Sequence, residues 1–309
     1  MEKLSVIIAT INDSIATNLT IAQILVQLER DRMDYEIIVV DNGSEEIEKM
    51  NLHEFIRFHK DFPISYHKYP IQGTIPPHSY GVTVATGKYI TMPDPHLIFS
   101  PSYFRTMIDS LNNLGAKVVF SPFGVGCITK RDGEYICESH LISPNPFGRV
   151  NSIGRSCLRD IPPFPIPSNT LSGFVAEKDW MMKIGNLFPE AFEKSGGHTA
   201  ESLMLGLTTW MFGGKCWAEP SAVIDHPMYR NGHGGGRNAN MCLSMATGAY
   251  ILGGQKYLDD MEYNYGKFVA GDLEEIPAVA YSARKYVIDN AKYTLDELVN
   301  NWEQIKNES

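Results

Sequence analysis

The sequence predicts an α/β fold with a mostly parallel sheet, and three features near its start indicate it. Residues 4–10, LSVIIAT, and residues 35–40, YEIIVV, are apolar runs rich in β-branched side chains, typical of strands buried on both faces. Between them, residues 18–29 repeat apolar side chains at helical spacing. A strand, a helix and a strand in this order form a βαβ unit, whose right-handed crossover joins parallel strands.

The rest of the chain continues the alternation of strands and helices. The pattern predicts a helix over residues 79–85, strands over 88–92 and 117–122, and a helix over 201–210 that Gly213 and Gly214 end.

Two longer stretches differ from this alternation. Residues 143–167 are rich in proline, arginine and glycine, which predicts an irregular insertion. From residue 238 to the end the pattern is helical. Thr294 and Glu297 have the spacing of a capping box, which predicts the start of the last helix.

Composition excludes several classes of protein. The 309 residues are 43% hydrophobic and 20% charged, as in an ordinary soluble globular protein. A net charge of −9 does not favour non-specific binding to nucleic-acid phosphates. The five cysteines form no C-x-x-C pair, and no apolar run reaches the length of a membrane span, about 18 residues. The first residues, MEKLSVIIAT, lack the cleavage region of a signal peptide, so we expect a cytoplasmic protein.

Polar residues follow three predicted strands, at the carboxyl edge where parallel sheets bind ligands. Thr10 and Asn12 follow the first strand, Asp41 follows the second, and Asp94-Pro95-His96 follows the strand at 88–92. By itself, D-P-H is most often a turn. The alternative is a metal site, because Asp and His at i and i+2 of an extended segment point to the same side.

Three stretches together resemble a known family. SVIIATIND, EIIVVDNGS and GVTVATGKYITMPDPH stand in the order and at the spacing of the nucleotide-sugar glycosyltransferases with the GT-A fold, most like family 2. Residues 172–226 resemble the second half of that domain. The resemblance implies a Rossmann-like, mixed and mostly parallel sheet flanked by helices. It implies a GT-A domain over residues 1–237, with residues 238–309 as a C-terminal helical extension.

The D-x-H form, with a distant histidine, resembles the polypeptide N-acetylgalactosaminyltransferases in particular. The resemblance implies that Asp94, His96 and His226 hold a metal ion together with the donor diphosphate. Mixed nitrogen and oxygen ligands suit Mn²⁺ better than Mg²⁺. A divalent ion stabilises the departing nucleoside diphosphate.

The resemblance also implies a donor site. Thr10, Asn12 and Asp41 resemble the positions that hold the nucleoside, and a carboxylate beside the base favours uracil, so a UDP-sugar is expected. For Asp41 a simple turn role is the alternative. Arg230 and His233, in a glycine-rich stretch, resemble a loop that closes over the donor. A solvated polar loop is the alternative.

The sequence departs from the family at the usual catalytic positions. Asn42 replaces the second Asp of the family's Asp-Asp-Gly-Ser, and Gly196-Gly197-His198-Thr199 stands where the family reads Gly-Gly-Glu-Asp. Inverting members use that lost Asp as a base. Three alternatives follow: His198 is the base, Glu201 is the base, or no base is needed because the anomeric configuration is retained. The resemblance to the D-x-H enzymes favours retention.

The predicted function is metal-dependent transfer of a sugar from a UDP-sugar to a hydroxyl acceptor. The acceptor is open: a protein, a glycan or a hydroxylated base of modified DNA. Arg149, Arg155 and Arg159 could meet an anionic acceptor or be solvated. A nucleotidyltransferase is disfavoured because ATINDS, after the first strand, has no glycine. A non-catalytic nucleotide or sugar binder is the other alternative, because the Glu-Asp pair is absent.

Overall fold

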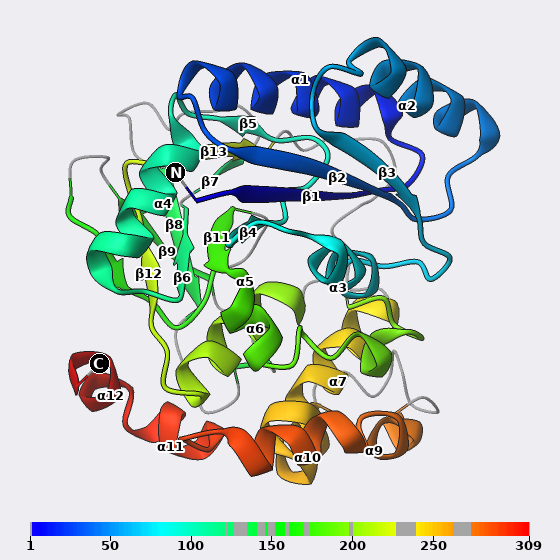
Figure 1. The fold of residues 1–309 in the computed structure, drawn as a ribbon. Coiled ribbons are helices and arrows are strands. Elements are labelled where there is room, and N and C mark those ends of the chain that lie inside the picture. The colour runs from blue at the N-terminus through cyan, green and yellow to red at the C-terminus, as the bar shows by residue number, and fades with distance from the viewer. Residues whose placement is uncertain are drawn as a thin grey trace.

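A computed structural model gives the fold of the chain (Figure 1). The structure describes residues 2–121, 123–125, 135–140, 146–147, 152–157, 161–169, 173–197, 200–226, 239–261 and 273–308. None of the helices in these ranges is long and apolar enough to cross a membrane.

The centre of the molecule is an eight-stranded mixed sheet, as the α/β prediction expected (Figure 1). Its order is β10-β12-β6-β11-β4-β1-β2-β3, and β1 pairs in parallel with both β2 and β4. β11 runs antiparallel to β4 and β6. The bounds are β1 Leu4–Thr10, β2 Tyr35–Asp41, β3 Ile64–Lys68, β4 Tyr89–Thr91, β6 Val118–Phe120, β10 Phe164–Pro165, β11 Phe174–Glu177 and β12 Cys216–Ala218.

Helices cover both faces of this sheet, because its strands are apolar on both faces (Figure 1). Val6 and Ile8 of β1 join one buried core with α1 and α4, while Ile7 points to the other core, with α3, α5 and α6. The bounds are α1 Ser14–Arg30, α2 Glu46–Phe58, α3 Ile75–Val84, α4 Tyr103–Leu114, α5 Lys178–Lys183 and α6 Ala200–Met211.

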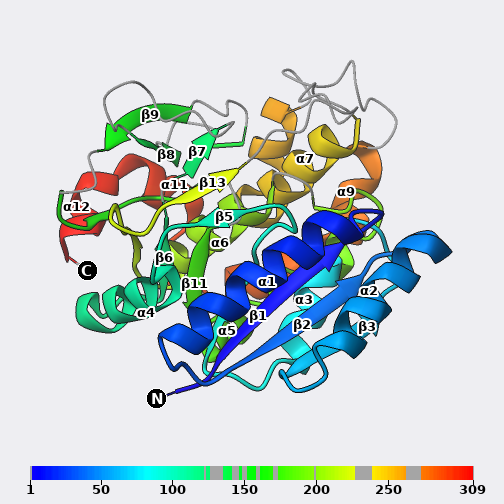
Figure 2. The same cartoon turned by 90° about the horizontal axis from the view of Figure 1, so that it is seen from above.

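A second, five-stranded sheet stands beside the first, as Figure 2 shows from above. Its order is β5-β13-β7-β8-β9, with bounds β5 Ile98–Phe99, β7 Phe123–Val125, β8 Tyr135–His140, β9 Ser152–Cys157 and β13 Ile224–His226. β9 and β10 both fall inside residues 143–167, so the prediction of an irregular insertion was wrong for those parts. β10 pairs with the distant β12, whereas β9 pairs with the preceding strand β8, so for β9 the sequence carried a local hairpin signal that was missed.

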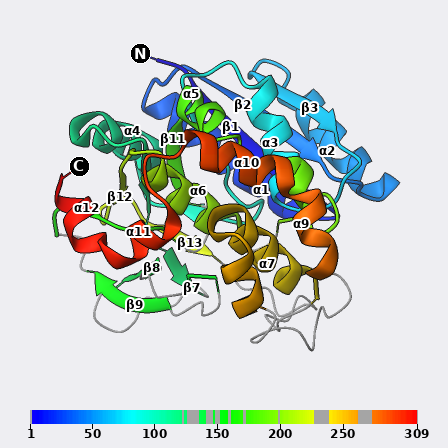
Figure 3. The same ribbon diagram turned by 90° about the horizontal axis from the view of Figure 1, so that it is seen from below.

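Helices of the C-terminal part pack outside α6 (Figure 3). Buried side chains of α7, α10 and α11 belong to the same core as those of α3 and α6. The bounds are η1 Pro189–Phe192, α7 Ala239–Gly253, η2 Leu273–Glu275, α9 Ile276–Val279, α10 Tyr281–Asn290, α11 Leu295–Asn300 and α12 Trp302–Glu308. The predicted division between residues 237 and 238 lies outside the described residues.

The predicted capping box is confirmed. The Thr294 hydroxyl accepts from the Glu297 backbone amide at 3.1 Å, and the Glu297 carboxylate accepts from the Thr294 amide at 2.7 Å. The helix that it begins is α11, and α12 follows it, so the box does not begin the last helix.

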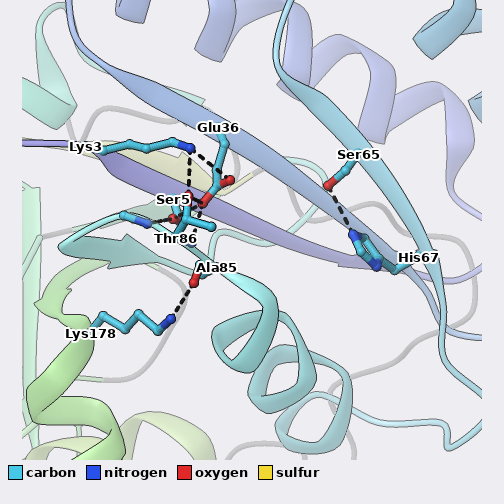
Figure 4. Close-up of polar contacts among 9 residues, drawn as sticks. Lys3, Ser5, Glu36, Ser65, His67, Ala85, Thr86 and Lys178 are labelled. Carbon is cyan, nitrogen blue, oxygen red and sulfur yellow. Dashed lines mark hydrogen bonds and ion pairs between the residues drawn. The ribbon is translucent and has the colours of Figure 1, made fainter.

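The amino edge of the large sheet carries a half-buried carboxylate, Glu36, in a set of hydrogen bonds that we name the Glu36 cluster: Lys3, Ser5, Glu36 and Thr86 (Figure 4). One carboxylate oxygen accepts from the Ser5 hydroxyl and the Thr86 amide, both at 2.6 Å, and the other accepts from Lys3 Nζ at 3.1 Å. Burial raises the pKa of Glu36, but these bonds outweigh it and lower the pKa to about 2. The cluster fixes the start of three adjacent strands.

Candidate active site

The predicted strand-end residues do meet at the carboxyl edge of the sheet. Thr10 and Asp41 end neighbouring strands and pair directly in the register of β1 and β2. The next amide, that of Asn42, donates to the Thr10 carbonyl at 2.9 Å. Thr10 is buried, and its hydroxyl lies 2.8 Å from that of Thr17 on α1.

Asp41 is held by bonds on both of its carboxylate oxygens. Oδ1 accepts from the Ser44 amide at 3.0 Å, and Oδ2 accepts from the Tyr66 hydroxyl at 2.6 Å. Burial raises the pKa of Asp41, but the bonds from Ser44 and Tyr66 outweigh it, so the net pKa is lowered. The residue is 1% exposed. Asp41 therefore orders the turn after β2, which is the alternative that the sequence left open, and its contact with uracil stays a prediction.

Asn12 joins the turns that follow β1 and β2. Its backbone is left-handed at φ 51°, a conformation that asparagine tolerates better than most residues. Its amide donates to Ser44 Oγ at 2.9 Å, and its side-chain oxygen accepts from the Glu45 amide at 2.7 Å. These bonds leave Asn12 at the surface, beside the buried Asp41.

Asp94 and His96 lie on the segment that follows β4. The segment is not extended as the spacing argument assumed, because Pro95 and His96 form a turn. Thr20 Oγ1 of α1 holds the turn by donating to the Pro95 carbonyl at 2.9 Å. His96 Nδ1 lies 3.3 Å from a carboxylate oxygen of Asp13. The contact with Asp13 and the charge of Asp94 raise the pKa of His96, so the two predicted ligands Asp94 and His96 are electrostatic neighbours.

His226 reaches the same region along its strand. β13 pairs antiparallel with β5, with Ile224 opposite Phe99 and Asp225 opposite Ile98. Asp225, the residue before His226, therefore lies opposite Ile98, which is two positions after His96. The structure describes only the backbone of His226. Among the described residues, no three His, Cys, Asp or Glu side chains gather as a metal site.

A close crossing of two glycines brings α3 and α6 together. The Thr74 amide donates to the Gly196 carbonyl at 2.7 Å, and a Cβ on Gly73 would lie 2.3 Å from the Gly196 backbone. Only glycine fits this approach. Asn42, where the family has an aspartate, donates through its side chain to the Gly73 carbonyl at 2.8 Å. The first turns of the two helices therefore face each other.

The crossing creates a pair that the sequence did not indicate, His78 of α3 with Glu201 of α6. Nδ1 of His78 lies 2.7 Å from a Glu201 carboxylate oxygen, and the two side chains are 3% and 16% exposed. Burial lowers the pKa of His78, but the charges of Glu201 and Asp94 outweigh it, and the net pKa is raised. His78 directly precedes the predicted helix at 79–85. Extending that helix through Pro76 and Pro77 would have placed it on a buried face.

Six other residues that the sequence singled out lie outside the described residues: Arg149, Arg159, His198, Thr199, Arg230 and His233. Glu201 is the one candidate base that the structure describes. Its carboxylate is engaged by His78, 123 positions away in the chain.

Comparisons with known proteins agree with this geometry. Residues 5–152 match the family model of glycosyl transferase family 2. The crystal structure of GalNAc-T7 with UDP, GalNAc and Mn²⁺ superposes with a TM-score of 0.70 at 15% identity, over 100% of this chain and 58% of that one. S. aureus TarS 1-349 superposes with a TM-score of 0.51 at 12% identity, over 98% of this chain and 91% of that one.

The likeness to these structures is one of fold, and the chain spans little more than half of GalNAc-T7. No match was found among curated protein sequences. The order of the large sheet, the polar carboxyl edge and the family match all lead to the same assignment. The chain is a GT-A fold protein whose residues 5–152 match glycosyl transferase family 2.

Proposed function

We propose that the protein is a metal-dependent glycosyltransferase that moves a sugar from a UDP-sugar to a hydroxyl acceptor. The observation that supports the proposal is the pairing of β13 with β5, in which Asp225 lies opposite Ile98. In the proposed site, His226 would approach Asp94 and His96 from a distant part of the chain, at the edge where such sheets bind ligands. The UDP and Mn²⁺ in the GalNAc-T7 structure support the same chemistry on this fold.

The donor set fits a divalent cation. Asp94 would supply a carboxylate oxygen, and His96 and His226 would supply imidazole nitrogens. This mixture suits Mn²⁺, with Mg²⁺ as the second choice. When bound, the ion would offset the negative charge that develops on the departing diphosphate. The hydrogen bond with Asp13 and, after it, the charge of Asp94 raise the pKa of His96.

Other residues at the same edge would bind the rest of the sugar donor. Thr10, Asn12 and the turn ordered by Asp41 would receive the nucleoside. Arg230 and His233 would close over the diphosphate from the segment after β13. We keep residues 1–237 as the transferase domain and residues 238–309 as its helical extension.

Retention of the anomeric configuration is the stereochemistry that we propose. It is supported by the bond between Glu201 and His78, which commits the Glu201 carboxylate and leaves it poorly placed to take a proton from the acceptor. His198 as the base of an inverting reaction is the competing mechanism. The anomer of the first product from an α-linked donor separates them, since a β-product would refute retention.

A panel of nucleotide-sugars incubated with Mn²⁺ in water tests the proposal, because many transferases slowly transfer the sugar to water. We expect metal-dependent release of UDP from a UDP-sugar. The runner-up is a non-catalytic binder, favoured by the loss of the family's Glu-Asp at His198 and Thr199. Tight binding of UDP-sugar without release of UDP, to water or to any acceptor, would favour the binder.

A further inference from the structure

His78 carries an atom that the fold does not use. Its ring lies on the first turn of α3 and is 2% exposed. Nδ1 is bound to Glu201 at 2.7 Å, whereas Nε2 is buried and has no hydrogen-bond partner among the described residues. Leaving a buried polar atom unpaired is destabilising, so such an atom requires an explanation.

The surroundings decide what this nitrogen can do. Two carboxylates act on the ring: Glu201 through a direct bond and Asp94 through its charge. These negative charges raise the pKa of His78 and so favour the imidazolium, in which both nitrogens carry a proton. Nε2 is then a donor of a charge-assisted hydrogen bond, and the partner that it lacks is an oxygen acceptor.

The position of the ring narrows the source of that oxygen. Asp94 belongs to the proposed metal site, where the donor diphosphate and the first atoms of its sugar would lie. Asn42, the residue after β2, donates to the Gly73 carbonyl just ahead of α3, so the first turn of α3, which carries His78, lies at the same carboxyl edge. The glycine crossing fixes α3 against α6, so the ring cannot turn away without breaking the Glu201 bond.

We infer that His78 Nε2 donates a hydrogen bond to an oxygen of the bound nucleotide-sugar, and that Glu201 is the positioning residue that orients the ring. The inference rests on the proposed function. It adds to the site a residue that binds the sugar donor, and whose positive charge is its own and not that of a metal ion. It also assigns Glu201 a role other than that of a base. The oxygen belongs either to the diphosphate or to the sugar.

Calorimetric titration of UDP and of a UDP-sugar, each with Mn²⁺, tests the inference. We expect His78→Gln to weaken binding about tenfold or more, as for loss of a hydrogen bond to a charged group. Weakening of both ligands assigns the diphosphate, and weakening of the UDP-sugar alone assigns the sugar. Glu201→Gln should weaken binding less than His78→Gln does. It should also lower the pKa of His78, so that binding declines at a lower pH than in the wild type.

His67→Gln is the matched control. His67 of β3 also contacts α3, through the Tyr80 hydroxyl at 3.3 Å, but its other nitrogen lies 3.1 Å from Ser65, as Figure 4 shows. We expect wild-type affinity from this variant. Wild-type affinity of a folded His78→Gln would overturn the inference and leave the proposed function standing. If the wild type itself binds neither ligand, the proposed function fails first.

A measurement on the wild type avoids dependence on a substituted core. With Mg²⁺ in place of paramagnetic Mn²⁺, the ¹⁵N signals of the His78 ring can be followed on addition of the UDP-sugar. We expect Nε2 to stay protonated and its signal to move on binding. An unchanged Nε2 signal in the saturated complex would overturn the inference even if the His78 variants did not fold.

Discussion

Two half-buried carboxylates at opposite edges of the same sheet have different hydrogen-bond partners. At the amino edge, both oxygens of Glu36 accept hydrogen bonds from neighbouring strands and from the segment before β4. Near the carboxyl edge, Glu201 is bonded to His78, whose second nitrogen has no partner in the described part of the chain. The hydrogen bonds of Glu36 are all made within the folded protein, whereas His78 needs a ligand to supply the partner of its second nitrogen.

The difference follows from where each edge lies in the chain. The Glu36 cluster joins residues next to strand starts, where every donor belongs to a strand or to the segment just before one. The carboxyl edge is built from segments that follow strands, and the Gly73–Gly196 crossing holds two of them together. Unsatisfied polar groups there lower stability and provide binding, as expected of functional sites.

Asp94→Ala should have the largest effect and should act on binding alone. Removing the carboxylate from the proposed metal site should weaken Mn²⁺-dependent UDP binding about 100-fold or more, because two imidazoles hold the ion poorly. Circular dichroism should show an unchanged fold, since Asp94 is partly exposed. A variant that binds UDP and Mn²⁺ like the wild type would show that the metal assignment is wrong.

Glu36→Gln should give the converse result, a loss of stability without a loss of binding. The lowering of the pKa from 4.5 to about 2 corresponds to about 3 kcal/mol of folding free energy at neutral pH. Chemical denaturation should therefore show a loss of about 2 to 3 kcal/mol, while calorimetry shows unchanged affinity for UDP. A loss of UDP affinity in Glu36→Gln would mean that the amino edge also contributes to binding.

The two clusters should respond to pH in opposite directions. The pKa of Glu36 is lowered by folding, so its contribution is present above about pH 4.5 and is lost as the pH falls toward about 2. The pKa of His78 is raised, so its contribution is present below about pH 6.5 and is lost as the pH rises through the folded value.

Urea denaturation of the wild type, Glu36→Gln and His78→Gln across this pH range measures both contributions. We expect the difference for Glu36→Gln to shrink in acid and that for His78→Gln to shrink in base. His67→Gln should run parallel to the wild type. If the stability differences of both variants shrank in the same direction of pH, the assigned charge states would be contradicted.

The smallest expected effect is on choice of base. Asp41 is held as an anion by Ser44 and Tyr66, so it can accept from the uracil ring only if the turn opens slightly. We expect UDP to compete with the donor about tenfold better than CDP or GDP, a difference worth about 1.4 kcal/mol. Equal competition by the three nucleotides would leave Asp41 with its turn role alone.

The sequence predicts some strands and some helices around the large sheet and misses others of both kinds. β1 and β2 are continuous apolar runs, and both predictions were confirmed. α2 and β3 were not predicted. Leu52 is the one fully buried residue of α2, but Phe55 and Ile56 pack against the core beside it at helical spacing, so this helix was a missed signal. α4, which has a clear apolar face, was a missed signal.

The candidate site also contains residues that the sequence predicts and residues that it does not. Thr10, Asp41 and Asp94 could be placed at one edge because parallel strands end together. His78 and Glu201 meet across 123 residues through a glycine crossing, and no local pattern carries that information. His198, Arg230 and His233 stay predictions.

Release of UDP from a UDP-sugar, measured by chromatography with Mn²⁺ and again with excess chelator, tests the central claim most directly. The wild type and Glu36→Gln should release UDP with the metal and not with the chelator, at temperatures where both are folded. Asp94→Ala should release none above the rate in buffer. Equal release by wild type and Asp94→Ala, or release that the chelator leaves unchanged, would contradict a metal-dependent transferase at the carboxyl edge.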